Sequence, residues 1–377
     1  MIIDEVLIFT PNFEQRVTKI AYGFLKHGIR TTVFGEEATL LSVFEGYNDG
    51  INFIKIPVNE KLKRTPLGTE RVSFIREELL KHIKHGQKTL IISRDVLYGY
   101  LVGRILADFN KDLFLYITDI ADNYDLFYDS FKNPIKRFVF KLGFGYLTRK
   151  AVGFSDAIYV VAKINERRML AVFQKQLISK RIYLLRNLPI KYDLILNTNK
   201  IPNTLVYLGK IDEISRDPFY VLEKLVSMPD YAIHFYSDQK ERTLDKIRKF
   251  AKDNDMEDRV IIHSRVKYAD LGKEISKYQI GLVPHKRSLI TDYTTPNKIY
   301  DYKNAGLVTV MSDCPSLIEE NSEFEFGFAY SKIKDDFIEV VRVAQNSPLN
   351  TSKVIPIWQE EFDDMYNKII EDYFADV

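Results

Sequence analysis

The sequence predicts an α/β protein with two domains, each built on a parallel sheet covered by helices. At about 150 residues per domain, 377 residues are too many for one compact core. Short apolar runs of strand length alternate with longer segments of helical period, which is typical of parallel βαβ units. This alternation stops once near the middle of the chain and then begins again, so we expect two similar layers.

The first layer covers residues 1–190. Its first predicted helix has an apolar face from Val17 to Leu25 and ends at Gly28, because glycine readily adopts the left-handed conformation that stops a helix. The strands are predicted at 6–10, 31–34, 52–56, 89–93, 113–118 and 157–161, with further helices near 70–85, 98–108, 134–153 and 163–176.

A polar stretch at 197–203 interrupts the pattern and is interpreted as a linker between domains. The second domain is predicted at 200–350, and 351–377 remain as a terminal helical segment. We expect the strand-to-helix loops of the two domains to face each other across a cleft. The second set of strands is predicted at 205–208, 232–236, 260–263, 280–283 and 308–311, with helices near 217–227, 240–254, 268–277 and 296–305.

Composition excludes several classes of protein. With 46% apolar and 28% charged residues, the chain is not intrinsically disordered. A net charge of +2 argues against a nucleic-acid partner. The single cysteine, Cys314, excludes a disulfide framework and a four-cysteine zinc site. The acidic start and the lack of a long apolar run predict a cytoplasmic protein without a signal peptide or a membrane span.

The segment 292–315 is the most informative part of the sequence. Thr295 is placed to cap a helix, Pro296 suits its first position, and Gly306 suits its end. The spacing therefore predicts a helix of about three turns.

The start of that helix is a candidate anion site. The backbone N–H groups of Asn297 and Lys298, together with the Lys298 charge, would hold a phosphate. Asp301 lies one turn further on the same face, where it would bind a sugar hydroxyl. The alternative is a capped helix with an ordinary surface acid.

The run from Pro296 to Asp313 resembles the donor-binding signature of GT-B glycosyltransferases, particularly the retaining family 4. The resemblance implies that Asp301 binds the ribose of a nucleotide sugar. The family often has a second glutamate eight positions before this acid, where this chain has Tyr293. Asp292 is the neighbouring candidate to replace it.

A second element agrees with this resemblance. Lys210 and Arg216 follow Gly209 on the loop after the first strand of the second domain, like the family's pair of cations that clamps the donor diphosphate. Fixed cations would stabilise the charge on a leaving nucleoside diphosphate without a metal. The alternative is solvated surface charge.

The resemblance extends over nearly the whole chain, including the terminal helix from Trp358, which it places back on the first domain. It implies that the loops at 264–266 and 285–292 hold the base and the sugar of the donor. The residues assigned there are Ser264, Arg265, Val266 and His285.

The first domain departs from the family pattern. The usual glycine pair after the first strand is absent, and Arg16 nearby either reaches the diphosphate or caps the first helix. The histidine often found in the cleft is also missing. Asp119 and Asp122 follow a strand of the sheet, where ligands bind in such folds. They are candidates to accept a proton or hydrogen bond from the acceptor hydroxyl, or they are structural caps.

Residues 131–150 contain six basic residues, five aromatic residues and no acid. We expect one apolar stripe to face the core and a second stripe, Phe140, Phe144 and Leu147, to remain near the basic residues. Such a face suits peripheral contact with anionic lipid, while the alternative is a helix buried on two sides. The stripe expected in the core consists of Ile135, Phe138, Val139, Leu142 and Tyr146.

The resemblance therefore predicts a retaining, metal-independent glycosyltransferase of GT-B fold that needs no cofactor. It would move sugar from a UDP- or GDP-linked donor, bound by 200–350, to an acceptor bound by 1–190. We expect the acceptor to be a lipid-linked or growing surface polysaccharide, reached from the cytoplasm at the inner face of the membrane. The alternatives are a nucleotide-sugar epimerase of the same fold and a non-catalytic partner subunit.

Overall fold

The computed structural model consists of two compact units, called unit 1 and unit 2 here. Unit 1 comprises residues 1–187 and 358–377, and unit 2 comprises 188–357. The structure describes residues 3–12, 15–37, 50–57, 69–120, 133–190, 194–211, 213, 215–237, 241–264 and 266–374.

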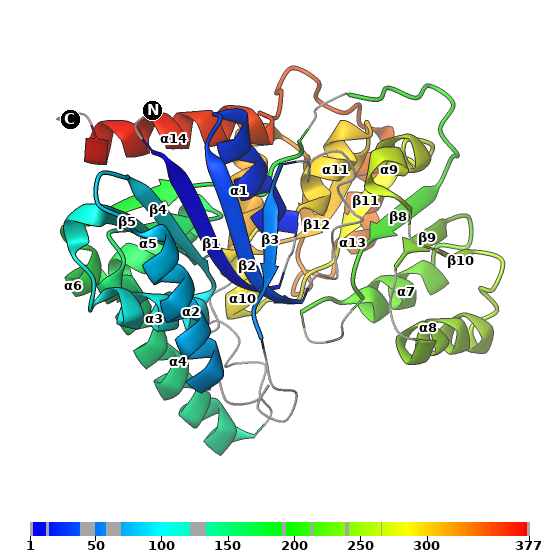
Figure 1. Cartoon of the computed structure of the whole chain (residues 1–377). Helices are drawn as coiled ribbons and strands as arrows, with labels where there is room; N and C mark the ends of the chain where they lie inside the picture. The colour runs from blue at the N-terminus through cyan, green and yellow to red at the C-terminus, as the bar shows by residue number, and fades with distance from the viewer. Residues whose placement is uncertain are drawn as a thin grey trace. The chain divides into compact units, whose positions relative to one another are not determined.

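In its described residues, unit 1 has a parallel sheet of seven strands in the order β3-β2-β1-β4-β5-β6-β7. Figure 1 labels β1 to β5 of this sheet. All six strands expected in this half are present. The seventh, β7, is only partly buried, so its sequence lacks the continuous apolar run of a central strand. The strands are β1 (Glu5–Asn12), β2 (Arg30–Glu37), β3 (Asn52–Lys55), β4 (Thr89–Arg94), β5 (Phe114–Asp119), β6 (Ala157–Val160) and β7 (Arg181–Leu184).

Helices cover this sheet, and the last helix of the chain packs on the first. The indole N–H of Trp358 donates to the carbonyl of Lys19 at 3.2 Å, and Phe362 lies directly against Gly23. The first helix stops at Gly28, which has φ of 74°, as predicted. The helices of unit 1 include α1 (Gln15–Lys26), α2 (Thr69–His82), α3 (Val96–Leu106), α4 (Pro134–Phe154), α5 (Lys163–Val172), α6 (Gln174–Leu177) and α14 (Trp358–Phe374).

In the described part of unit 2, six parallel strands form a sheet in the order β10-β9-β8-β11-β12-β13. The five predicted strands are confirmed, and the sixth, β13, lies at the edge and is mostly half-buried. The strands are β8 (Thr204–Leu208), β9 (Ala232–Tyr236), β10 (Val260–His263), β11 (Ile280–Val283), β12 (Val308–Ser312) and β13 (Gly327–Tyr330).

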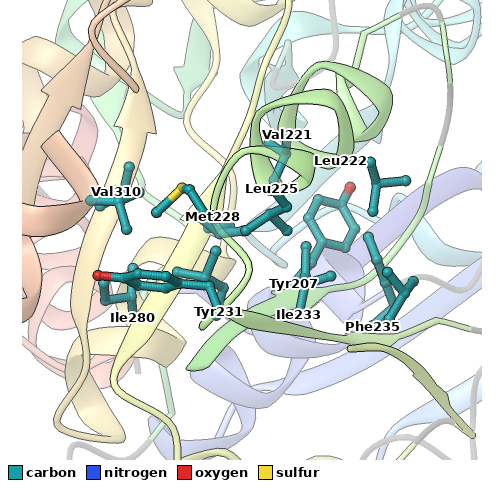
Figure 2. Close-up of a cluster of buried hydrophobic side chains, with 14 of the residues drawn as sticks. Tyr207, Val221, Leu222, Leu225, Met228, Tyr231, Ile233, Phe235, Ile280 and Val310 are labelled. Atoms are coloured by element: carbon teal, nitrogen blue, oxygen red, sulfur yellow. The ribbon is translucent and has the colours of Figure 1, made fainter. Parts of the chain in front are cut away.

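The core of unit 2 lies between this sheet and its helices. Figure 2 shows Val221, Leu225 and Met228 above the strand residues Ile233 and Ile280, all of them buried. Burial of such side chains holds the strands in register and fixes where each strand ends. The helices of unit 2 include α7 (Pro218–Val226), α8 (Glu241–Asp253), α9 (Tyr268–Ile275), α10 (Leu289–Tyr293), α11 (Lys298–Asn304), α12 (Pro315–Phe324) and α13 (Phe337–Asn346).

The strand order of unit 2 reverses at the centre of the sheet. From β8 the chain builds β9 and β10 on one side, and it then returns to build β11, β12 and β13 on the other. In open parallel sheets, ligands bind at the carboxyl ends of the strands where the order reverses. The strand order therefore predicts a ligand site at the loops that follow β8 and β11.

Helix α4 packs on α3 through small residues. A Cβ atom built on Gly99 would lie 2.9 Å from Cβ of Ala151, and one built on Gly103 would lie 2.5 Å from Cβ of Phe154. This close approach buries Thr148, Ala151 and Val152.

The stripe of α4 expected in the core is in fact exposed, so that prediction is wrong. Its five side chains, Ile135 to Tyr146, are 52–73% exposed, whereas Phe140, Phe144 and Leu147 are half-buried. The helix has apolar residues on opposite faces, and only its C-terminal part, which includes Ala151 and Phe154, fits closely against the glycines of α3.

We expect Gly103→Ala to destabilise unit 1 and Gly143→Ala to stabilise it. The first substitution forces a methyl group into the α3–α4 contact, at a cost of about 1–3 kcal/mol. Among the described residues, no heavy atom lies within 4 Å of a Cβ built on Gly143. Alanine there should add about 0.5–1 kcal/mol through its helix propensity. Urea unfolding followed by circular dichroism measures both, and equal effects of the two variants would contradict the packing described.

Candidate functional site

The loop after β8 begins at a glycine that the backbone requires. Gly209 has φ of 86°, a left-handed conformation that favours glycine, and its N–H donates to the carbonyl of Tyr236 in β9 at 2.9 Å. The hydroxyl of Tyr207 donates to the carbonyl of Lys210 at 2.5 Å. These contacts hold the start of the loop at the end of the sheet and leave Lys210 exposed.

The end of this loop is joined to the end of β11. The N–H of Asp217 donates to the carbonyl of Pro284 at 2.7 Å, and the N–H of Lys286 donates to that of Ser215 at 3.1 Å. Between them, Arg216 forms an isolated antiparallel bridge with His285. The structure therefore brings together two residues that lie 69 positions apart and that the sequence assigned to the donor.

His285 is a buried side chain with unused hydrogen-bonding groups. It is only 5% exposed, and neither ring nitrogen has a hydrogen-bond partner among the described residues. Burial lowers the pKa of His285 well below its usual value, and the nearby charges of Arg216 and Lys298 lower it further. A neutral imidazole offers one N–H donor and one acceptor nitrogen.

Lys298 supplies a second cation beside His285. Its side chain is largely buried, and its ammonium lies 3.9 Å from the centre of the Tyr207 ring. Tyr207 was not expected in the site, although it directly precedes the glycine-led loop. It now links Lys298 to the carbonyl of Lys210.

The predicted cap at Thr295 is wrong. Helix α11 begins at Lys298, after Asn297, so Thr295 lies too far ahead of the first turn to cap it. Within the part of the chain that the structure describes, the buried hydroxyl of Thr295 has no hydrogen-bond partner. Helix α11 has seven residues, so the prediction of about three turns beginning at Pro296 is also wrong. Gly306, with φ of 72°, follows the end of the helix as predicted.

The two acids of this segment differ in their surroundings. Asp301 is half-buried and lies three residues after Lys298, on the same face of α11. Asp292 forms a bidentate ion pair with Arg287, with nitrogen–oxygen distances of 2.7 and 3.1 Å. The carboxylate of Asp292, in α10, is thus bound by an arginine that lies just before that helix.

The three residues expected to hold the base lie after β10. Ser264 is exposed and Val266 is half-buried, while Arg265 lies outside the described residues. Because β9 and β8 separate β10 from β11, the sheet order does not bring this loop next to His285.

Ser237, which directly follows β9, is a further candidate for contact with a ligand, and the sequence did not predict it. Its hydroxyl is buried and unpartnered among the described residues, and it follows Tyr236, which binds the N–H of Gly209. Its place at the carboxyl end of a strand next to the reversal point is a signal that the sequence pattern did contain.

In unit 1, Arg16 and Asp119 bind each other. The Arg16 guanidinium donates to both oxygens of the fully buried Asp119 carboxylate, at 2.7 and 3.1 Å. It also donates to the carbonyl of Leu185 at 2.8 Å and to the side-chain oxygen of Asn187 at 3.1 Å. The Arg16 side chain therefore lies in the core of unit 1 and does not cap the first helix. Asp122 lies outside the described residues.

Two further properties concern metals and membranes. Among the described residues, no group of three or more histidine, cysteine, aspartate or glutamate side chains is arranged to hold a metal ion. Within the same ranges, no helix combines the length and apolar character needed to cross a bilayer.

No protein-family model and no curated protein sequence matches the chain. Solved structures are nevertheless similar over its whole length. Sucrose-phosphate synthase from Thermosynechococcus elongatus is 13% identical, with a TM-score of 0.69 over 99% of this chain and 100% of that one. Anabaena HepE, in complex with UDP and glucose, is 10% identical, with a TM-score of 0.67 over 97% and 99%.

The lipopolysaccharide outer core galactosyltransferase WaaB gives a TM-score of 0.62 at 11% identity, over 97% of this chain and 99% of that one. Likeness at this level of identity shows the fold. The chain therefore has the GT-B fold, with two Rossmann-like units.

We expect the stability of the protein to fall as the pH drops below about 6.5, the ordinary pKa of histidine. Folding lowers the pKa of His285, so the unfolded chain binds the proton first and gains stability in acid. Desolvation lowers the pKa of His234 to about 4 and also lowers that of His263, so these groups act in the same direction.

The free energy of unfolding, measured by urea titration between about pH 7 and 5, should depend less on pH in His285→Gln than in the parent. His85→Gln, at an exposed position, serves as the control. An identical pH dependence in the parent and in His285→Gln would contradict this account of the buried imidazole.

We expect Asp119→Ala to destabilise unit 1 by about 3–5 kcal/mol, because it leaves the buried Arg16 guanidinium without its carboxylate partner. Asp112→Ala, at an exposed position, should have little effect. Chemical unfolding measures both variants. A fully stable Asp119→Ala protein would show that this ion pair does not hold the unit together.

Proposed function

We propose that unit 2 binds the diphosphate of a nucleotide sugar and that the protein transfers this sugar to an acceptor. One observation carries the proposal: the buried imidazole of His285, which has no hydrogen-bond partner among the described residues, lies near the charges of Arg216 and Lys298 at the reversal point of the sheet. Buried polar groups normally have partners, so an anionic ligand that accepts hydrogen bonds fits this place.

The chemistry follows from the charges. As the bond between sugar and diphosphate breaks, negative charge builds up on the leaving phosphate oxygen. Arg216 and Lys298 are fixed before the reaction and stabilise that charge without reorganisation, and the N–H of neutral His285 donates to the same group. Because side chains neutralise the diphosphate, we infer that transfer needs no divalent metal.

The remaining donor contacts are assigned by position. Thr295 precedes Lys298 by three residues, and its hydroxyl, which has no partner among the described residues, would donate to a phosphate oxygen. Asp301, on the same helix face as Lys298, would accept hydrogen bonds from the ribose hydroxyls. Retention of configuration at the sugar is inferred from the resemblance of the 296–313 segment to family 4 signatures.

We infer that the acceptor is a glycan, either lipid-linked or part of a growing surface polysaccharide. The similarity in fold to a lipopolysaccharide galactosyltransferase supports this class of acceptor. Because the Asp119 carboxylate is bound by Arg16, we do not assign contact with the acceptor hydroxyl to Asp119.

Uridine or guanosine diphosphate should raise the melting temperature of the protein. A ligand at 100 times its dissociation constant adds about 2.7 kcal/mol to the free energy of unfolding. Arg216→Ala and Asp301→Ala should abolish the shift, and Arg248→Ala, an exposed arginine on α8, should retain it. Differential scanning fluorimetry compares these proteins.

Assays of the same proteins with and without an acceptor distinguish sugar transfer from the alternative functions. Release of nucleoside diphosphate from a nucleotide sugar only with a glycan acceptor supports transfer. Conversion of the donor without any acceptor would instead identify an epimerase. No binding of any nucleotide would overturn the proposal and favour a non-catalytic partner subunit.

A further inference from the structure

The exposed stripe of α4 is an unusual surface for a folded protein. Ile135, Phe138, Val139, Leu142 and Tyr146 follow one another at intervals of three or four residues, so they lie on one face of the helix. All five are more than half exposed, and the residues that α4 buries, Thr148, Ala151 and Val152, lie on the opposite face. Contiguous apolar patches of this kind mark interaction sites.

The charge of α4 identifies the partner. The helix carries five basic residues and no acid. Lys136 and Lys141 lie in the exposed N-terminal half of α4. Arg149 and Lys150 follow the stripe after Tyr146. The Lys150 ammonium lies 5.8 Å from the centre of the Tyr146 ring. A second copy of the same face would oppose cation to cation, which disfavours self-association.

We propose that this face of α4 binds the surface of an anionic lipid bilayer, with the apolar stripe inserted among the acyl chains and the basic residues at the headgroups. Amphipathic helices with this composition lie in the plane of the membrane interface. The inference does not depend on the proposed sugar transfer.

The direction of α4 determines which edge of the unit 1 sheet would lie close to the membrane. In a parallel sheet, the connecting helix returns from the carboxyl ends of the strands to their amino ends. The exposed N-terminal half of α4 therefore belongs to the carboxyl edge of the sheet, where β5 ends at Asp119 (Figure 1). Docking would bring this edge close to the lipid headgroups.

Flotation with lipid vesicles tests the proposal on the full chain. The protein should float with vesicles of phosphatidylcholine and phosphatidylglycerol, and much less with phosphatidylcholine alone. Phe138→Gln/Leu142→Gln should lower the partition coefficient by more than roughly tenfold. Leu80→Gln, at an exposed leucine of α2, should leave it unchanged. The substituted side chains are exposed, so circular dichroism should show an unchanged fold.

A second variant tests how much the basic residues of α4 contribute to membrane binding. Lys136→Gln/Arg149→Gln should lower binding to the anionic vesicles by roughly tenfold, and added salt should weaken binding of the parent protein. Failure of the parent protein to float with anionic vesicles would overturn the proposal. So would a dimer, seen by analytical ultracentrifugation, that the Phe138→Gln/Leu142→Gln variant dissociates while vesicle binding is absent.

Discussion

Two backbone hydrogen bonds join the loops that leave β8 and β11, and the candidate site depends on them. The N–H of Asp217 binds the carbonyl of Pro284, and the N–H of Lys286 binds that of Ser215. Because the strand order of unit 2 reverses between these strands, their loops meet at the carboxyl edge of the sheet. The result is that Arg216 and His285 are fixed by backbone geometry before any ligand arrives, which is what electrostatic stabilisation of a transition state requires.

The burial of His285 near two cations supports the proposed diphosphate ligand. Desolvation and the charges of Arg216 and Lys298 all oppose protonation of the imidazole, so the group acts as a neutral donor. A buried donor without a partner costs about 1–3 kcal/mol, which a ligand oxygen regains on binding. A doubly charged diphosphate satisfies the cations and the imidazole together, whereas a neutral sugar satisfies only the imidazole.

The sequence predicted the strands well where they are buried on both faces, because such strands are continuous apolar runs, but it missed the half-buried edge strands β7 and β13. Loop and helix signals named Gly209, Arg216 and Lys298, and the structure places Arg216 and Lys298 near His285. It could not show that Asp119 is bound by Arg16, 103 positions away, because no local pattern records a distant partner. Periodicity likewise showed which residues of α4 share a face, but not that glycines in α3 would select the opposite face for packing.

The most direct test of the central claim is the side-chain ¹⁵N spectrum of His285 during titration with uridine diphosphate. The chain has only six histidines, so a His285→Gln variant assigns the signal. The account predicts a neutral imidazole in the free protein near pH 6, whose N–H resonance shifts when the diphosphate binds. Binding of the nucleotide with the His285 resonances unchanged, or an imidazole already protonated at that pH, would contradict the account.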